Sequence, residues 1–414
     1  MRNDNFENYN RAIISIMWKP KQQIGVGDVV ISPLAKKYVN QVLNSGRLTY
    51  GPFIQEFEKK VAKSHRVKYA IFCNSGTSAL QVALHILKKV HGWKDGDEVL
   101  VPALTFVATV NIVLQNNLKP VFVDIERDYF GINPELITSK ITTKTRAIIP
   151  VHVGGQSADM KPILQIAKEH NLRIIEDSCE TMFAKYHGKP VGSFGDFSCF
   201  STYAAHTLVT GVGGFICTSN VEYAVMAKSL VNHGRDGIYT AIDDDRIKNQ
   251  KSLFNIVDRR FNFVDVGYSY RATEFEGAVG VAQISDKHKI LAGRKRNAMY
   301  LSQKLKDLHK YLQLPKTRSG SEHIFMFFPM VIRSKKIKRS DLILFLEKNL
   351  IETRYLLPLL NQPVYRKLFG DIEDRFPVAK DINENGFYIG CQPSLTKKEL
   401  DYVIGKFHEF FAKI

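Results

Sequence analysis

The feature that most constrains the fold is a regular alternation of apolar runs and amphipathic stretches between about residues 50 and 290. Runs rich in β-branched and aromatic residues, which are typical of strands, occur at 68–73, 97–102, 120–125, 146–153 and 172–178. Stretches with helical periodicity lie between several of them, at 77–90, 105–116 and 161–170. Short strands that are apolar on both faces and are separated by helices are typical of a mainly parallel sheet with helices on each side. The sequence therefore predicts an α/β fold.

A change of pattern after Gly267 divides the chain into parts. Helical periodicity runs from there to about residue 312, and a mixed segment follows, with a strand at 325–332 and helices at 340–349 and 397–411. A chain of 414 residues is long enough for one large and one smaller domain. We therefore predict a large domain at 46–290, a smaller α+β domain at 291–414, and an N-terminal segment, 1–45, that packs beside the smaller domain.

The charge and the cysteines narrow the class of protein. The net charge is +17, but the Lys and Arg residues are scattered, which favours a solvated surface, or the attraction of phosphorylated small molecules, over a nucleic-acid interface. The five cysteines form no CxxC pair, so neither a disulfide framework nor a metal site is indicated, and reduced thiols are expected. The chain has neither a basic start followed by a long apolar stretch nor an apolar run of about 18 residues. We therefore expect a cytoplasmic protein without a signal peptide or a membrane span.

Three segments contain residues that are suited to chemistry. The turn at 74–78, NSGTS, follows a strand and opens a helix, so it is either an ordinary capped turn or a phosphate site made of backbone amides and hydroxyls. The strand at 172–178 ends in Glu176 and Asp177, where a carboxylate either caps a helix or pairs with a positively charged ring nitrogen. The glycine-rich segment 192–214 contains Ser201 and Thr202 as candidate phosphate donors. It also contains His206, which is either a packed histidine or a catalytic base.

The order and spacing of these motifs resemble the DegT/DnrJ/EryC1/StrS group over nearly the whole chain. The motifs that carry the resemblance are GRLTYGP (46–52), SGTSAL (75–80), PALTFVAT (102–109), KPVFVDI (119–125), IIPVHVGGQSADM (148–160), IEDSCE (175–180), VGSFGDFSCFS (191–201), GVGGF (211–215), NHGRD (232–236), VGYSYRATEFEGA (266–278) and PVAKD (377–381). Members of this group are pyridoxal-phosphate enzymes that act on nucleotide-linked keto-sugars. The resemblance thus implies the aspartate-aminotransferase type I fold, with pyridoxal or pyridoxamine phosphate bound in the larger domain.

The resemblance also implies roles for individual residues. It assigns cofactor contacts to Ser75, Gly76, Thr77, Phe106, Asp177, Glu180, Ser201 and Arg271. Backbone amides of the 75–77 turn and the Ser201 hydroxyl would bind the phosphate, Phe106 would cover the ring, and Asp177 would pair with the pyridine nitrogen. Glu180 falls where most members carry Gln or His beside the ring oxygen.

Arg271 belongs to a segment that, in the family, comes from the neighbouring subunit and helps to bind the phosphate. Ser269 stands where the family has Asn, which weakens that contact. Because the active sites of the family are shared across a dimer interface, the resemblance implies a homodimer.

One departure from the family is decisive for the chemistry. The aminotransferases bind the cofactor covalently through a lysine in a pattern like FSFYPTK, whereas the matching stretch here, FSTYAAH, ends in His206. No lysine occurs between Lys189 and Lys228. An imidazole has no primary amine and cannot bind the cofactor aldehyde in this way, so the cofactor is expected to be held non-covalently.

This replacement resembles the branch of the family typified by GDP-4-keto-6-deoxymannose 3-dehydratase. The resemblance implies that His206 acts as the base while the C3 hydroxyl leaves a nucleotide-linked 4-keto-6-deoxysugar, and that an amino donor such as glutamate regenerates pyridoxamine phosphate. A related subgroup uses an iron–sulfur cluster, which needs clustered cysteines, and the dispersed cysteines of this chain disfavour it.

Other functions stay open at this point. Thr207 replaces a second His of the dehydratase pattern, and Val212 replaces the acid of the usual GEGG loop. The alternatives are therefore a different reaction of the same cofactor, such as transamination or isomerisation of a sugar, or a non-catalytic binding protein that lost the lysine. The sugar and the nucleotide would be read by loops such as 236–262, where Arg259 and Arg260 either meet a diphosphate or lie in a solvated loop.

Overall fold

Seven strands form the central sheet of the protein, in the order β1-β9-β8-β5-β4-β2-β3. The computed structural model describes residues 18–236, 249–259 and 261–414. The strands of the sheet are β1 (Tyr69–Cys73), β2 (Glu98–Pro102), β3 (Lys119–Val123), β4 (Thr145–Ile148), β5 (Arg173–Asp177), β8 (Phe197–Ser201) and β9 (Gly214–Thr218). The pairs β2–β3, β2–β4, β4–β5 and β5–β8 are parallel, and only β9 runs against its two neighbours in this sheet. The expected α/β fold with a mainly parallel sheet is confirmed.

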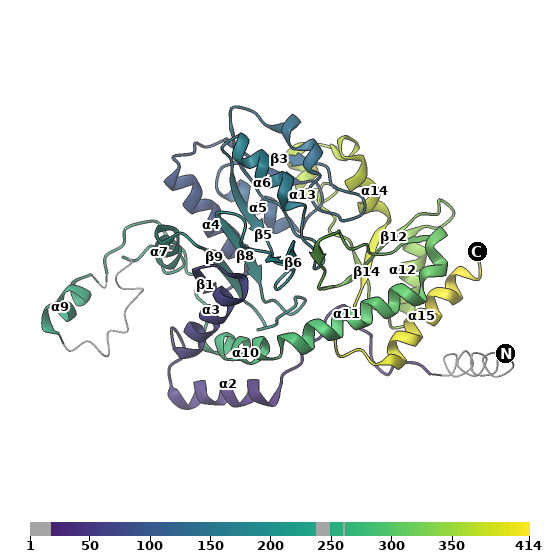
Figure 1. Cartoon of the computed structure of the whole chain (residues 1–414), viewed down its shortest axis with the longest axis horizontal. Coiled ribbons are helices and arrows are strands. Elements are labelled where there is room, and N and C mark those ends of the chain that lie inside the picture. Colours follow the sequence, from purple (N-terminus) through teal and green to yellow (C-terminus); the bar gives the residue numbers. More distant parts are fainter. Residues whose placement is uncertain (1–17, 237–248, 260) are drawn as a thin grey trace.

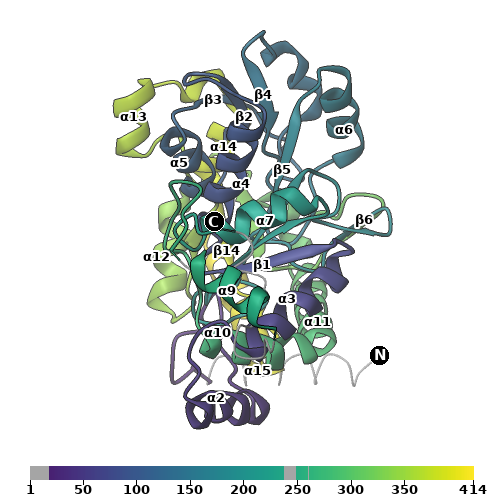
Figure 2. The ribbon, with the colours of Figure 1, turned by 90° about the vertical axis from the view of Figure 1, so that its left-hand side faces the viewer.

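Helices cover both faces of this sheet, as the apolar character of its strands requires (Figures 1 and 2). One face packs on α4 (Gly76–Val90), α5 (Val107–Gln115) and α7 (Val221–Leu230). The other face packs on α6 (Met160–Glu169) at one end and on α3 (Pro52–His65) and α10 (Glu274–Ser285) at the other. The expected strands and helices up to residue 178 lie within a few residues of their predicted positions, whereas β8 and β9 were not predicted.

The C-terminal part of the chain forms a second sheet of four antiparallel strands, in the order β10-β12-β14-β13. Its strands are β10 (Leu312–Gln313), β12 (Phe328–Ile332), β13 (Arg354–Tyr355) and β14 (Gly386–Ile389). Buried side chains join it to α11 (Lys287–Lys304), α12 (Arg339–Lys348) and α15 (Lys397–Phe411). Side chains of α13 (Pro363–Phe369) and α14 (Pro377–Asn385) pack instead into the core of the larger sheet.

The remaining elements are short. A three-stranded sheet is formed by β6 (Lys185–Tyr186), β7 (Lys189–Pro190) and β11 (Ser321–Glu322). Single 3-10 turns occur at η1 (Pro134–Leu136), η2 (Thr138–Lys140), η4 (Lys306–Lys310) and η5 (Glu373–Arg375). Within the described residues, no helix combines the length and the apolar character that a bilayer crossing requires.

The N-terminal segment contacts both parts of the molecule. Ile24 forms a parallel bridge with Ile351 beside the smaller sheet, and the Trp18 ring packs edge-on against Tyr402 of α15. The following helix, α2 (Pro33–Ser45), lies against α10 (Figure 1). The division of the chain at residues 45 and 290 stays a prediction.

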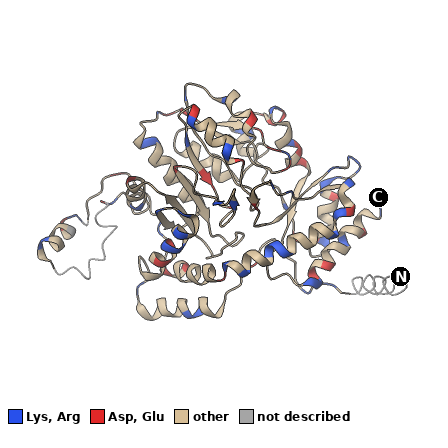
Figure 3. Ribbon diagram, viewed as in Figure 1, with Lys and Arg blue, Asp and Glu red and all other residues tan. Residues whose placement is uncertain are grey.

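The segment after α7 carries α9 (Gln250–Asp258), which stands apart from the rest of the chain (Figure 1). Arg259, one of the two arginines singled out in the sequence, forms an ion pair with the buried Asp236, whereas Arg260 and residues 237–248 lie outside the described residues. Lys and Arg occur on helices in both parts of the molecule, with Asp and Glu among them (Figure 3).

The start of α3 is held by a buried carboxylate from α10. Glu274 accepts hydrogen bonds from the backbone N–H groups of Gly51, Phe53 and Ile54, at 2.8–3.0 Å. These amides belong to the first turn of α3, where no intrahelical acceptor exists. A Cβ atom at Gly51 would lie 2.5 Å from a Glu274 carboxylate oxygen, so only glycine allows this approach.

A carboxylate of α3 itself, Glu58, also points into the protein and predicts that the free energy of unfolding depends on pH. Burial raises the pKa of Glu58 from 4.5 to about 7, although the Phe72 N–H donates a hydrogen bond to it. Because the pKa is higher in the folded protein, the wild type loses stability as the pH rises from 4.5 through 7. We predict that Glu58→Gln is more stable than the wild type at pH 8, by up to roughly 3 kcal/mol, and equally stable near pH 4.5. Urea unfolding at both pH values measures this, and an advantage that does not change with pH would contradict it.

Candidate functional site

A cavity of about 410 Å³ lies at the carboxyl ends of β5 and β8, where α4 and α5 begin. This is the position at which open parallel sheets bind their ligands. Its lining includes all the expected site residues except Arg271, namely Ser75, Gly76, Thr77, Phe106, Asp177, Glu180, Ser201 and His206. Met326, Leu357 and Tyr388 close it from the C-terminal part of the chain.

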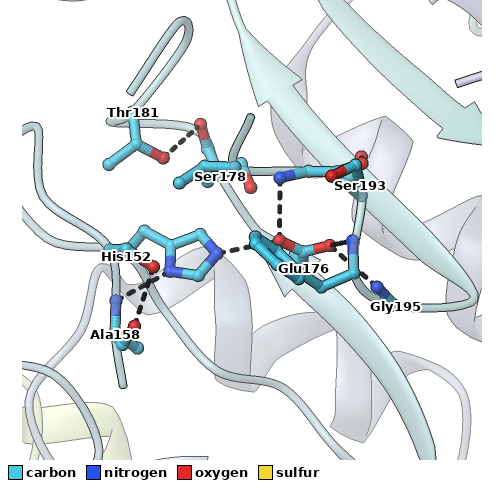
Figure 4. A network of polar contacts seen from close by, with 12 residues as sticks. His152, Ala158, Glu176, Ser178, Thr181, Ser193 and Gly195 are labelled. Carbon is cyan, nitrogen blue, oxygen red and sulfur yellow. Dashed lines mark hydrogen bonds and ion pairs between the residues drawn. The ribbon is translucent and has the colours of Figure 1, made fainter. Parts of the chain in front are cut away.

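The two carboxylates at the end of β5 point to opposite sides because successive side chains of a strand alternate. Glu176 is fully buried and accepts hydrogen bonds from the backbone N–H groups of 192, 194 and 195, at 2.7–2.8 Å (Figure 4). The N–H of Ala158 donates to His152 Nδ1, so the ring proton lies on Nε2, which faces a Glu176 oxygen at 3.2 Å. Glu176 is thus a structural carboxylate with several donors.

Asp177 faces the cavity and has few partners. Its Oδ2 accepts from the Thr109 hydroxyl at 2.8 Å, and the Cys179 N–H lies 3.3 Å from its Oδ1. The Thr109 hydroxyl has a single proton, which it donates to Asp177. In the hydrogen bond between Thr105 and Thr109, the Thr105 hydroxyl is therefore the donor and Thr109 the acceptor. Burial raises the pKa of Asp177, and the hydrogen bonds from Thr109 and Cys179 oppose this effect. A positive charge in the cavity would compensate this buried carboxylate.

The part of the cavity wall formed by the start of α4 is suited to a phosphate group. The first turn of α4 lies in the wall, and the amides of such a turn have no acceptor within the helix. A Cβ atom at Gly76 would lie 2.9 Å from Cβ of Ser201, so the glycine lets the helix start approach that hydroxyl residue. Ser75 has a second use, because its Oγ accepts the Ser78 N–H and caps the helix.

His206 lies in a short turn in which its N–H donates to the Tyr203 carbonyl at 2.9 Å. Its side chain is half-buried in the cavity wall, and its Nδ1 has no hydrogen-bond partner among the described residues. Removal from water lowers the pKa of His206 to about 4, and the positive charge of Arg294 contributes. The imidazole is therefore neutral at pH 7.

Glu180 has an unusual acidity for a carboxylate. Its Oε2 accepts the Gly154 N–H at 2.7 Å. Burial raises the pKa of Glu180 to about 7, the hydrogen bond from Gly154 lowers it, and the negative charge of Asp177 raises it. Glu180 therefore exists in both protonation states near neutral pH.

Several lining residues were missed by the sequence analysis. They are Thr105, Tyr203, Met326, Leu357 and Tyr388. Thr109, which was also missed, does not line the cavity but donates a hydrogen bond to Asp177. Thr105 and Thr109 lie within the PALTFVAT motif, so their spacing of one helical turn was an available signal. Tyr388 and Leu357 carry no local signal, because only the packing of the smaller sheet brings them to the cavity.

Arg271 does not line this cavity. Its guanidinium donates to Ser269 Oγ at 3.2 Å and lies 3.1 Å from His233 Nε2 on the exposed side of the chain. Val212 lines the cavity, whereas Thr207 faces the opposite way. No lysine is found among the residues that line the cavity, and the described chain contains no cluster of His, Cys, Asp and Glu that could hold a metal ion.

Comparison with known proteins identifies the family of the chain. The sequence model of the DegT/DnrJ/EryC1/StrS aminotransferase family matches residues 30–408. The GDP-perosamine synthase of Escherichia coli O157:H7 is 33% identical, over 91% of this chain and 95% of that protein. The dTDP-4-dehydro-2,6-dideoxy-D-glucose 3-dehydratase of Saccharopolyspora spinosa is 30% identical, over 89% and 82%.

Two solved structures of a GDP-4-keto-6-deoxymannose 3-dehydratase are similar to the whole chain. One is a variant with a histidine replaced by asparagine and with GDP-perosamine bound, and the other is the E. coli enzyme with hydrated pyridoxal phosphate. Each is 26% identical to this chain, with a TM-score of 0.83, and each match covers 93% of this chain. The match covers 100% of the variant's chain and 99% of the chain with hydrated pyridoxal phosphate. The expected aspartate-aminotransferase type I fold is thereby confirmed.

The two neighbouring carboxylates of β5 form a matched pair for mutation. We predict that Glu176→Gln lowers the free energy of unfolding by about 3 kcal/mol or more, because a neutral amide cannot accept from three buried N–H groups and one imidazole. Asp177→Asn should keep the stability within about 1 kcal/mol but weaken the binding of pyridoxamine phosphate, because an amide cannot compensate a ring cation. Urea unfolding and a fluorescence titration with the cofactor measure both effects. Equal loss of stability in the two variants would contradict the separation of roles.

Proposed function

The chain belongs to the DegT/DnrJ/EryC1/StrS aminotransferase family, and we propose that this pyridoxal-phosphate-dependent, sugar-modifying enzyme removes the C3 hydroxyl of a nucleotide-linked 4-keto-6-deoxysugar. The proposal rests on one observation above all: His206, which the sequence motif aligns with the lysine of the family aminotransferases, lies in the cavity wall, and none of the described residues of that wall is a lysine. The dehydratases among the similar proteins support this reaction class.

The residues of the cavity fit a non-covalently bound pyridoxamine phosphate. The first turn of α4 and Ser201 would hold the phosphate, Asp177 would face the ring nitrogen, and the exposed ring of Phe106 would lie over the cofactor. When bound, this cofactor supplies a primary amine for the sugar ketone and an electron-accepting ring. The buried carboxylate of Asp177 would stabilise the positive form of that ring.

His206 would act as the base of the reaction. A base must be unprotonated at the working pH, and burial together with Arg294 keeps this imidazole neutral, with a pKa of about 4. A histidine at this position moves protons but cannot bind the cofactor covalently, which separates its role from that of a lysine.

Glu180 would stand beside the ring oxygen of the cofactor. The family uses Gln or His there, and both can donate a hydrogen bond. A glutamate donates only when it is protonated, and a pKa of about 7 makes that form available at neutral pH.

Transamination is the second candidate, because GDP-perosamine synthases are among the similar proteins. With glutamate as amino donor, both reactions would use the same cofactor form. The absence of a lysine from the described residues of the cavity wall favours dehydration, because the family aminotransferases carry a lysine at the position of His206, whereas the replacement by histidine resembles the dehydratase branch.

We also propose a homodimer with shared active sites. Arg271, which the family contributes from the neighbouring subunit, lies outside the cavity of its own chain. Large apolar side chains are exposed on α9 and on the stretch that precedes Arg271, namely Phe254, Val257, Phe261, Phe263, Val264 and Val266. A surface of this kind is typical of a protein–protein contact.

The reaction is tested with the wild type and two variants of His206. Nucleotide-linked 4-keto-6-deoxysugars, beginning with GDP-4-keto-6-deoxymannose, are incubated with pyridoxamine phosphate and glutamate and followed by mass spectrometry. The wild type should release a 3-deoxy-4-keto sugar that is lighter than its substrate by one oxygen atom, with ammonia as the second product and pyridoxamine phosphate converted to pyridoxal phosphate, and should resist trapping of pyridoxal phosphate by borohydride. His206→Lys should be trapped covalently and lose dehydration, because its amine binds the aldehyde.

His206→Gln serves as the control, since it should show neither dehydration nor trapping. Borohydride trapping of the wild type would mean that another lysine binds the cofactor and would overturn the role of His206. An amino sugar as the main product would identify the enzyme as an aminotransferase.

The shared site predicts complementation between inactive subunits. Co-expressed His206→Gln and Arg271→Ala chains should recover about one quarter of the wild-type activity, because half of the dimers are mixed and each mixed dimer has one complete site. Each variant alone should be nearly inactive in the same assay. If Arg271 acts in its own subunit, no mixed dimer has a complete site, and co-expression would recover nothing.

A further inference from the structure

A second cavity, of about 290 Å³, lies behind the turn that carries His206. Its walls come from the segment before α2, the stretch after His206, the junction of α10 and α11, and the loop before α15. Thr207 lines this cavity, whereas the preceding residue, His206, lines the first one. The same turn therefore separates the two cavities.

Arg294 of α11 gives the second cavity its charge. Its side chain is 2% exposed, and within the described residues no carboxylate lies close enough to form an ion pair with it. Its Nη1 donates to the carbonyls of Phe325 and Met326, and its Nη2 lies 3.4 Å from the carbonyl of His206. These acceptors are neutral, so the charge of Arg294 is buried without an anion, which is energetically costly.

Two buried polar atoms, Arg294 Nε and Thr207 Oγ1, have no hydrogen-bond partner among the described residues, and both residues line the cavity. In a guanidinium group, Nε–H and one N–H of Nη2 point to the same side and bind a carboxylate through two parallel hydrogen bonds. That side of Arg294 is the one that the carbonyl contacts of Nη1 leave free.

The rest of the lining selects the ligand. Val30, Val209, Ile290 and Pro393 give the cavity an apolar wall, and its volume suits a short ligand. Two exposed carboxylates, Asp28 and Asp286, and one exposed ammonium group, Lys289, also line the cavity, and their net negative charge disfavours a dianion such as phosphate. We propose that this cavity is a binding site for a small monocarboxylate with a short apolar body, which pairs with Arg294.

The site is coupled to the active site through its shared wall. Arg294 contacts the backbone of His206, and its positive charge is one of the two causes that lower the pKa of His206. A bound carboxylate would cancel this charge and raise the pKa of His206. This effect does not depend on which reaction the enzyme catalyses.

The test uses the full-length protein saturated with pyridoxamine phosphate, so that the first cavity is filled. Isobutyrate is the probe, and isobutyramide, which has the same shape without the charge, is its control. Calorimetry should give one site per chain for isobutyrate, with a Kd on the order of 1 mM, and at least about tenfold weaker binding of isobutyramide. Isobutyrate should also raise the pKa of His206 in an NMR titration, with His206→Gln used for assignment.

Two neighbouring exposed valines give matched variants that leave Arg294 and the active site intact. Val30 is 57% exposed and lines the cavity, whereas Val29 is 42% exposed and does not. Val30→Trp should fill the cavity and weaken isobutyrate binding by at least about tenfold, and Val29→Trp should leave it unchanged. Equal affinity in both variants, equal loss in both, or no saturable binding to the wild type would overturn the proposal.

Discussion

The cavity of this enzyme depends on a carboxylate that does not face it. Glu176 is held inside the protein by three backbone N–H groups of the 192–195 turn and by His152. A strand directs its side chains alternately to its two faces, so anchoring Glu176 on one face commits Asp177 to the other. The same contacts attach the 192–195 turn to β5, and this turn leads directly into β8 and the His206 segment. The hydrogen bonds to the buried Glu176 carboxylate thus set the positions of both Asp177 and His206, the two residues that are central to the proposed chemistry.

The charge state of the site follows from its depth rather than from ion pairs. Asp177 and Glu180 both lose water on folding, and burial raises the pKa of each. The same loss of water lowers the pKa of His206, because it disfavours the charged form of either kind of group. Arg294 adds to this effect without an acid to neutralise it. Burial thus disfavours the charged forms of Asp177, Glu180 and His206. A ligand with a positive and a negative group at fixed positions would supply the opposite charges that these side chains lack.

Much of this arrangement is visible in the sequence, and the rest depends on tertiary contacts. The apolar strands and amphipathic helices up to residue 178 alternate regularly, so their positions were predicted within a few residues. The strands β8 and β9 were missed because FSCFS and GFICT contain Ser, Thr and Gly among their apolar residues. The motif order identified the residues of the 75–77 turn, Asp177 and His206, which the structure brings together in one cavity. Tyr388, Leu357 and the buried Arg294 lie more than a hundred residues from most of these motifs or outside any pattern, so only the packed chain reveals them.

The substitution of Glu180 for the usual Gln or His is consistent with the electrostatics of the cavity. A positively charged ring nitrogen beside Asp177 would keep that residue ionised, and an ionised Asp177 disfavours a second negative charge nearby. Glu180 would then retain its proton above the pH at which an exposed glutamate loses it, and a protonated carboxyl group can donate a hydrogen bond as Gln does. The Gly154 N–H occupies only one of its two oxygens, so the other oxygen can carry the proton toward the cavity. Burial is thus the main reason why the acid at position 180 can act as a donor, and Asp177 adds to this effect.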